Sequence, residues 1–197
     1  TSPTALVFPL KKLIKEANKR GIISIIDGAH APGHIKLNIS DLKADFYSGN
    51  CHKWMMAPKG AAFLWANKNN KNILEPLVIS HGWLPNNYRK LQKGEFSNDR
   101  FIDNFEVQGT RDPSAWLAIP DAIKFIKNKK YAKAFNDSAK LAYETATRIA
   151  KLTKIPLLAN QDFLAPQMIS IPVPYCNVDN LKQKLLKKFN IEIPVIK

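Results

Sequence analysis

The chain has 197 residues, of which 45% are hydrophobic, and this composition excludes a disordered segment and predicts a globular core. Its apolar runs are too short to cross a bilayer, and no secretory signal pattern opens the sequence. The formal net charge of +14 raises the question of nucleic-acid binding. The lysines are spread over several predicted helices and have no aromatic residues interleaved with them. Nucleic-acid binding is therefore the minor alternative.

The first elements follow from the hydrophobic pattern. Residues 8–20 carry apolar side chains at helical spacing and predict an amphipathic helix that Gly21 ends. The β-branched run at residues 22–26 shows no alternation, which predicts a parallel strand buried on both faces. Asp27 stands at the carboxyl end of that strand.

Three short elements are expected next: a helix at residues 39–42 and strands at residues 46–47 and 61–65. Asn38 or Ser40 would cap the helix. Lys53 falls in the loop between the two strands. Strands alternating with helices are typical of an α/β fold, in which ligands gather at the carboxyl ends of strands.

The rest of the chain predicts a long loop, a helical block and a second unit. Residues 67–109 are polar and irregular, with one expected strand at residues 77–80. Residues 120–152 predict one or two helices. A strand, a helix and a strand would then form the start of a smaller α+β domain, at residues 168–173, 178–189 and 191–195. We therefore expect three parts, at residues 1–120, 121–155 and 156–197.

Lys53 is the most informative residue, because it lies between a histidine and a tryptophan. Partial burial frees a lysine amine to act as a nucleophile, as a Schiff-base lysine must. The alternative is a stem that packs on Trp54 with its ammonium group in water. Asp27 needs a cationic partner if it is buried, such as the protonated ring nitrogen of pyridoxal phosphate. The alternative for Asp27 is a turn-forming role in the Asp-Gly pair.

Three segments together resemble the class V aminotransferase family, in the order that this family has them. They are Asp27-Gly28-Ala29-His30-Ala31-Pro32-Gly33, then Asp45-Phe46-Tyr47-Ser48-Gly49-Asn50-Cys51-His52-Lys53-Trp54 with Ala57-Pro58-Lys59-Gly60, and Gln108-Gly109-Thr110-Arg111-Asp112. Within the family the chain is most similar to the isopenicillin N epimerase-like branch. The resemblance implies fold type I. The chain would be the C-terminal part of a large pyridoxal phosphate domain, a mainly parallel sheet flanked by helices, plus the start of the small domain.

The resemblance implies a role for each matching residue. Lys53 would form the Schiff base with pyridoxal phosphate and move the α-proton of the substrate. Asp27 would face the pyridine nitrogen of the cofactor. His30 matches a position that contacts the phenolic oxygen of its ring, and the alternative is a histidine satisfied by backbone in a turn.

Other matching residues would bind the cofactor phosphate. Asn50 and His52 match phosphate-contacting positions just before the lysine, where Asn50 replaces a commoner serine. Thr110 matches a residue that reaches the phosphate of the neighbouring subunit, which implies a homodimer with a shared cofactor site. Arg111 would add positive charge there or form an ion pair with Asp112.

The remaining polar residues are given structural roles. Trp54 is expected to pack, His34 to lie on the surface, and Cys51 to fill a buried space. Cys176 is a poor candidate for the persulfide-carrying residue of a desulfurase. Two distant cysteines predict neither a disulfide nor a metal site and favour a reducing, cytoplasmic location.

The expected function is that of a pyridoxal phosphate enzyme that acts on an amino acid, as an epimerase or an aminotransferase. A cysteine desulfurase or lyase of the same family is the nearest alternative, and a non-catalytic paralogue is another. The first residue is Thr1 and family segments are missing on both sides. We therefore expect a fragment that is inactive on its own.

Overall fold

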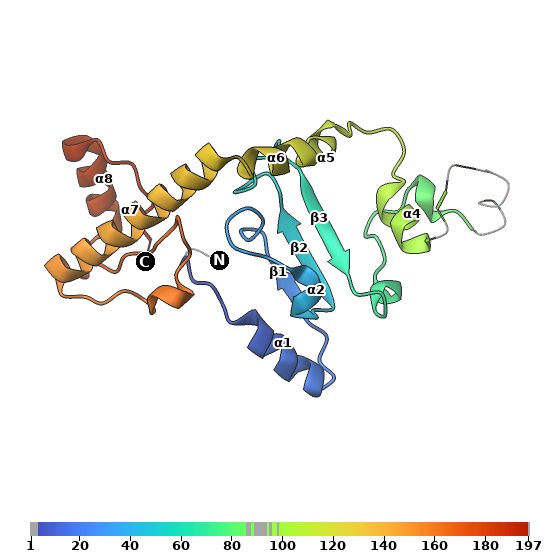
Figure 1. The fold of residues 1–197 in the computed structure, drawn as a ribbon, viewed down its shortest axis with the longest axis horizontal. Coiled ribbons are helices and arrows are strands. Elements are labelled where there is room, and N and C mark those ends of the chain that lie inside the picture. The colour runs from blue at the N-terminus through green and yellow to red at the C-terminus, as the bar shows by residue number, and fades with distance from the viewer. Residues whose placement is uncertain (1–3, 86–87, 89–93, 95, 98, 197) are drawn as a thin grey trace.

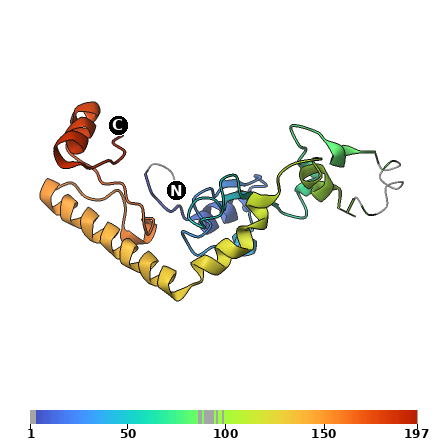
Figure 2. The ribbon, with the colours of Figure 1, turned by 90° about the horizontal axis from the view of Figure 1, so that it is seen from above.

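The computed structural model describes residues 4–85, 88, 94, 96–97 and 99–196. Figure 1 shows a small central sheet with helix α1 (Leu10–Lys19) below it and helices α5 (Ser114–Leu117) and α6 (Ile119–Ile126) above it. Helix α7 (Lys129–Thr153) leads away to the C-terminal segment. Figure 2 shows that α6 and α7 meet at a sharp bend.

The described sheet is mixed and has the order β1-β2-β3. Strand β1 (Ile25–Asp27) runs parallel to β2 (Phe46–Asn50), with Asp27 opposite Ser48. Strand β3 (Ala62–Ala66) is antiparallel to β2. The α/β fold class is confirmed, and one of its two strand pairings is parallel.

The expected strand at residues 22–26 is shorter and more exposed than its sequence suggested. Ile22, Ile23 and Ile25 are 55%, 51% and 76% exposed, so the prediction of burial on both faces is wrong. Ser24 instead donates its backbone N–H and its hydroxyl to the carboxylate of Asp45, at 2.8 and 2.9 Å. A run of β-branched residues favours extended backbone. Burial of the strand on both faces would also need packed elements above and below the sheet at this point, and the described residues do not provide them.

Several helices begin and end close to where the sequence placed them. Helix α2 (Ile39–Leu42) is capped by the side chain of Asn38, which accepts from the N–H of Asp41. Helix α8 (Val178–Phe189) is capped in the same way by Asn177. The described residues also form the helical segments η1 (Lys71–Ile73), η2 (His81–Trp83), α4 (Arg100–Glu106) and η3 (Gln161–Phe163).

Three expected strands are not found: within the described residues, the segments at 77–80, 168–173 and 191–195 are irregular. A strand persists only where a neighbour accepts and donates its backbone hydrogen bonds. Outside the three-stranded sheet, the described residues hold one isolated bridge, between Leu6 and Leu164. The second unit therefore shows its helix without its strands, and the three domain boundaries stay predictions.

A small apolar cluster anchors the loop after β2 to the helices above the sheet. Cys51, Ala57 and Ala61 are buried there with Ala122 of α6. Cys51 is 3% exposed, which confirms its expected role as buried filler, and burial raises the pKa of its thiol. The loop that carries Lys53 thus has a rigid base.

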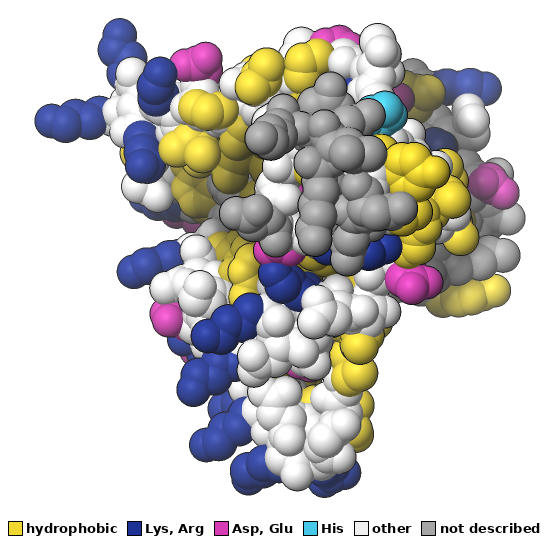
Figure 3. All heavy atoms as spheres, turned by 90° about the vertical axis from the view of Figure 1, so that its right-hand side faces the viewer, with side chains coloured by type: hydrophobic (Ala, Val, Ile, Leu, Met, Phe, Trp, Pro, Cys, Tyr) yellow, Lys and Arg dark blue, Asp and Glu magenta, His cyan; other side chains and the backbone are white. Residues whose placement is uncertain are grey.

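The charged surface is dominated by cations. Figure 3 shows Lys and Arg side chains projecting at the margin of one face, with few acidic side chains beside them. The ion pairs along the helices, such as that of Lys124 with Asp121 at 3.0 Å, are exposed and contribute little to stability. In the described part of the chain, no helix is long and apolar enough to cross a membrane.

Candidate functional site

The site forms where β1 and β2 end, because parallel strands present their carboxyl ends at one edge of a sheet. Asp27 ends β1, and the loop that follows it carries His30. Asn50 ends β2, and the next loop carries Lys53 before the chain returns as β3. Two loops from neighbouring strands therefore bring together residues that lie more than twenty positions apart.

Lys53 contacts His30, a contact that the sequence analysis did not predict. Its Nζ lies 3.2 Å from Nε2 of His30, and the indole Nε1 of Trp54 donates to Nδ1 of the same ring, also at 3.2 Å. The imidazole is thus held between the amine and the indole. Lys53 is exposed, so its expected partial burial is not found, and the alternative with its head group in water stays open beside the contact with His30. The alternative for His30, a ring satisfied by backbone, does not match these side-chain partners.

The imidazole of His30 is kept neutral by its surroundings. Burial lowers its pKa, and the positive charge of Lys53 lowers it further, while the nearby carboxylate of Asp27 opposes both effects. The net direction is downward. A neutral ring keeps one nitrogen as a donor and one as an acceptor.

Asp27 has one occupied and one available carboxylate oxygen. Its Oδ1 accepts from the backbone N–H of Ala29 at 2.9 Å, so the turn-forming alternative holds for that oxygen. Among the described residues, no hydrogen bond reaches Oδ2. The carboxylate is exposed at the strand end and is available to a cationic partner.

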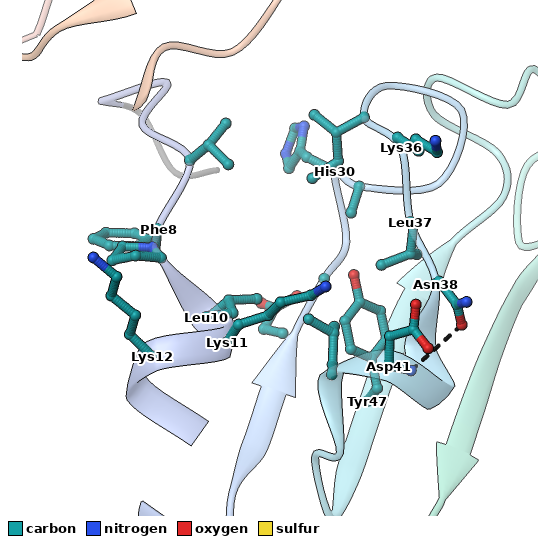
Figure 4. A pocket seen from close by; sticks show the side chains of 17 residues that line it. Phe8, Leu10, Lys11, Lys12, His30, Lys36, Leu37, Asn38, Asp41 and Tyr47 are labelled. Carbon is teal, nitrogen blue, oxygen red and sulfur yellow. Dashed lines mark hydrogen bonds between the residues drawn. The ribbon is translucent and has the colours of Figure 1, made fainter. Parts of the chain in front are cut away.

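A cavity of about 690 Å³ opens beside these residues and is lined in part by Asp27, His30 and Tyr47. Figure 4 shows Lys11 extending from α1 toward Tyr47, with Asp41 on the opposite side. The walls are mostly apolar, and the lysines of α1 lie at one rim. A space of this size and lining suits a small organic ligand with an anionic group.

Tyr47 fits tightly against Gly28. The tyrosine is 1% exposed, and a Cβ on Gly28 would lie 2.0 Å from its hydroxyl oxygen. Burial raises the pKa of Tyr47, and the charge of Asp27 adds to that rise. Tyr47 carries no functional signal in the sequence, because a tyrosine within a strand is typical of a core residue.

Replacing Gly28 by alanine is expected to destabilise the protein by about 2 kcal/mol, because the ring of Tyr47 must move inside a packed region. Urea unfolding measures the loss. In a Tyr47→Leu background the same substitution should cost much less, since the clashing ring atoms are gone. Equal costs in both backgrounds would contradict this packing explanation.

The structure places the expected phosphate residues on the same loop and strand. His52 donates its Nδ1–H to the carbonyl of Ala61 at 3.0 Å, which fixes the ring and leaves Nε2 unbound by the described residues. Asn50 lies opposite Ala62 at the end of β2. These positions are compatible with the expected roles, which stay predictions.

Thr110 and Arg111 lie apart from this cluster, in the segment before α5. Thr110 is exposed and makes no hydrogen bond within the described residues, and its contact with a second subunit stays a prediction. The guanidinium of Arg111 donates to Gln108 at 2.7 Å and stacks on Trp116 at 4.4 Å. The alternative for Arg111, an ion pair with Asp112, is not found among the described residues, and Asp112 accepts from Ser114.

His34 is not on the surface, so that prediction is wrong. It is 2% exposed and stacks on Trp54, with ring centroids 3.9 Å apart and an interplanar angle of 11°. Its Nε2 accepts from the backbone N–H of Gln167 at 3.4 Å. Burial lowers the pKa of His34 to about 4. A second histidine four positions after His30 was the available signal, but its packing partner lies twenty residues away.

Trp54 is half-buried, which agrees with the expected packing role, but its indole N–H also reaches the site. The cysteines are free, with Cys51 buried and Cys176 exposed. The described residues contain no group of three or more metal-ligating side chains. At the strand ends the described residues place an amine, an imidazole and a carboxylate, those of Lys53, His30 and Asp27.

These features define a lysine-centred site on an α/β sheet, and comparison with known proteins identifies the family. The model of the family described as aminotransferase class-V matches residues 3–195, so the chain belongs to the class V aminotransferases. This is a family of pyridoxal phosphate enzymes, which confirms the expected cofactor at the level of the family.

The similar curated proteins include two isopenicillin N epimerases. That of Amycolatopsis lactamdurans is 31% identical over 198 residues, which cover 99% of this chain and 50% of that protein. That of Streptomyces clavuligerus is 38% identical over 126 residues, which cover 63% of this chain and 32% of that protein. The expected likeness to the epimerase branch is confirmed. The chain spans half or less of the length of these relatives.

The fold has solved counterparts. An apo cysteine desulfurase from Thermococcus onnurineus NA1 matches with a TM-score of 0.72 at 20% identity, over 95% of this chain and 46% of that chain. At this identity the match shows a shared fold and does not transfer an activity.

Proposed function

We propose that the whole protein is a pyridoxal phosphate enzyme that acts at the α-carbon of an amino acid, in the manner of an isopenicillin N epimerase-like protein. The observation that supports this most is the placement of the Lys53 amine, 3.2 Å from His30, beside the strand that ends in Asp27. An amine nucleophile and a carboxylate at neighbouring strand ends are the two groups that this cofactor requires.

The residues present fit the cofactor. One carboxylate oxygen of Asp27 accepts from the backbone N–H of Ala29, and the other oxygen is available for a cationic ring nitrogen. His30 offers a neutral imidazole beside it. His52 is fixed through Nδ1, so that Nε2 remains for a phosphate oxygen, with Asn50 two residues earlier. When bound, pyridoxal phosphate supplies an electron-withdrawing ring that acidifies the α-C–H bond of the substrate.

The residues of this chain then perform three tasks. Lys53 would hold the cofactor through its amine, and its Nζ would move the α-proton of the substrate. Asp27 stabilises positive charge on the ring nitrogen through its carboxylate. His30 orients the amine from one side. The rigid base of buried Cys51, Ala57 and Ala61 keeps the lysine in position.

Three further assignments belong to the same proposal. The substrate is an amino acid, and the outcome is epimerisation if the proton returns on the opposite face. Thr110 contacts the cofactor phosphate of a second subunit in a homodimer. The enzyme works in the cytoplasm, where Cys51 and Cys176 stay reduced.

Borohydride reduction of the cofactor-loaded protein tests the assignment of Lys53. The expected result is loss of the visible absorbance of the cofactor and a mass increase on the peptide that contains Lys53. Lys59→Ala is the matched control, because Lys59 is exposed on the same loop and should not alter the labelling. Labelling of another lysine, or none, would overturn the proposal. Screening amino acids then separates epimerisation from transamination and from sulfide release.

A further inference from the structure

We propose that Trp54 is a positioning residue that fixes the tautomer of His30 and thereby presents a donor N–H to the amine of Lys53. This inference rests on the proposed function of Lys53 and adds a residue that acts through another. It starts from the two hydrogen bonds of one imidazole, to Trp54 at Nδ1 and to Lys53 at Nε2, each 3.2 Å long.

The direction of these hydrogen bonds follows from the chemistry of the groups. An indole nitrogen only donates, so Nδ1 of His30 must accept from Trp54 and carries no proton. Because the imidazole is neutral, its single proton is on Nε2. That N–H points at Nζ of Lys53. Trp54 therefore decides which nitrogen of His30 faces the lysine as a donor.

Trp54 can impose this tautomer because its own ring is held in place. Its indole stacks on the buried ring of His34, with 3.9 Å between centroids and nearly parallel planes. His34 is anchored in turn by the backbone N–H of Gln167. The backbone carbonyl of Trp54 also lies 3.5 Å from the hydroxyl of Tyr131 on α7. The indole N–H thus has little freedom to turn away from His30.

The direct test is the protonation of each ring nitrogen of His30 in the cofactor-free protein. Long-range ¹⁵N–¹H correlation spectra of histidine-labelled protein at neutral pH should show an unprotonated Nδ1 and a protonated Nε2. The indole N–H of Trp54 should exchange slowly with solvent. A protonated Nδ1 in the unmodified protein would overturn the proposal without any variant, so misfolding of a variant cannot hide the answer.

Trp54→Phe removes the donor and keeps an aromatic ring for His34. It should produce a mixture of His30 tautomers, because the loss of one hydrogen bond changes their ratio about fivefold. Trp116→Phe is the matched control, because Trp116 lies under the guanidinium of Arg111 and its loss should leave the His30 tautomer unchanged. An unchanged tautomer in folded Trp54→Phe would also overturn the proposal.

The two proposals fail in different ways. If borohydride labels Lys53 while Nδ1 of His30 is protonated, the function stands and the role of Trp54 is wrong. If His30 shows the expected tautomer while another lysine is labelled, the positioning holds and the function of Lys53 is wrong.

Discussion

Lys53→Ala is expected to lower turnover in the whole protein at least about a thousandfold, because both attachment of the cofactor and proton transfer lose their only proposed amine. The change should act on kcat far more than on the unfolding free energy, since Lys53 is exposed at its loop. Steady-state kinetics and the visible absorbance of the loaded protein measure the two effects.

Two variants control this experiment. Lys53→Arg keeps the positive charge but lacks a nucleophilic amine, so it should be as inactive as the alanine variant. Lys59→Ala removes a nearby exposed lysine and should retain full activity. Retention of more than about a tenth of the activity in Lys53→Ala would rule out the amine as the proton carrier.

Stability should fall steeply in mild acid because His34 is buried as a neutral ring. Its pKa is lowered to about 4, whereas the unfolded chain has an ordinary histidine value of 6.5. Above pH 6.5 both states are neutral and stability is complete. As the pH falls from 6.5 to 4, protons bind the unfolded state preferentially, and about 3 kcal/mol of unfolding free energy is lost.

Urea unfolding at several pH values between 4 and 8 checks this expectation. His34→Phe is the matched variant, because phenylalanine can stack on Trp54 and does not titrate. It should lose the acceptor for Gln167 equally at every pH and so flatten the difference between pH 7.5 and pH 4.5. Parallel curves for the two proteins would show that His34 does not cause the acid sensitivity.

The features predicted best from the sequence are those that depend on residues close together in the chain. The bounds of α2 and α8 follow from capping by Asn38 and Asn177, signals that lie within three positions of the groups they satisfy. The sequence placed Lys53 in the loop after β2, but its flanking His52 and Trp54 suggested a burial that the exposed side chain does not have. Asp27 could be paired with Lys53 because both follow strands.

Features that depend on packing between distant segments could not be predicted from the sequence. The burial of His34 arises from its stack on Trp54, and nothing near position 34 signals that partner. The hydrogen bond of Trp54 to His30 likewise joins two loops. The isoleucines of residues 22–26 predicted burial because of their type, but the burial of a strand is decided by the layers above and below it.

The fit of Tyr47 against Gly28 has a consequence for how the two strands find each other. Side chains alternate along a strand, so a slip of one residue would turn Tyr47 to the opposite face and leave a gap at Gly28. Only the observed pairing fills that gap and sets Asp27 level with Ser48. Gly28 therefore favours one register of β1 against β2. That register also sets the distance between the Asp27 carboxylate and the loop that carries Lys53.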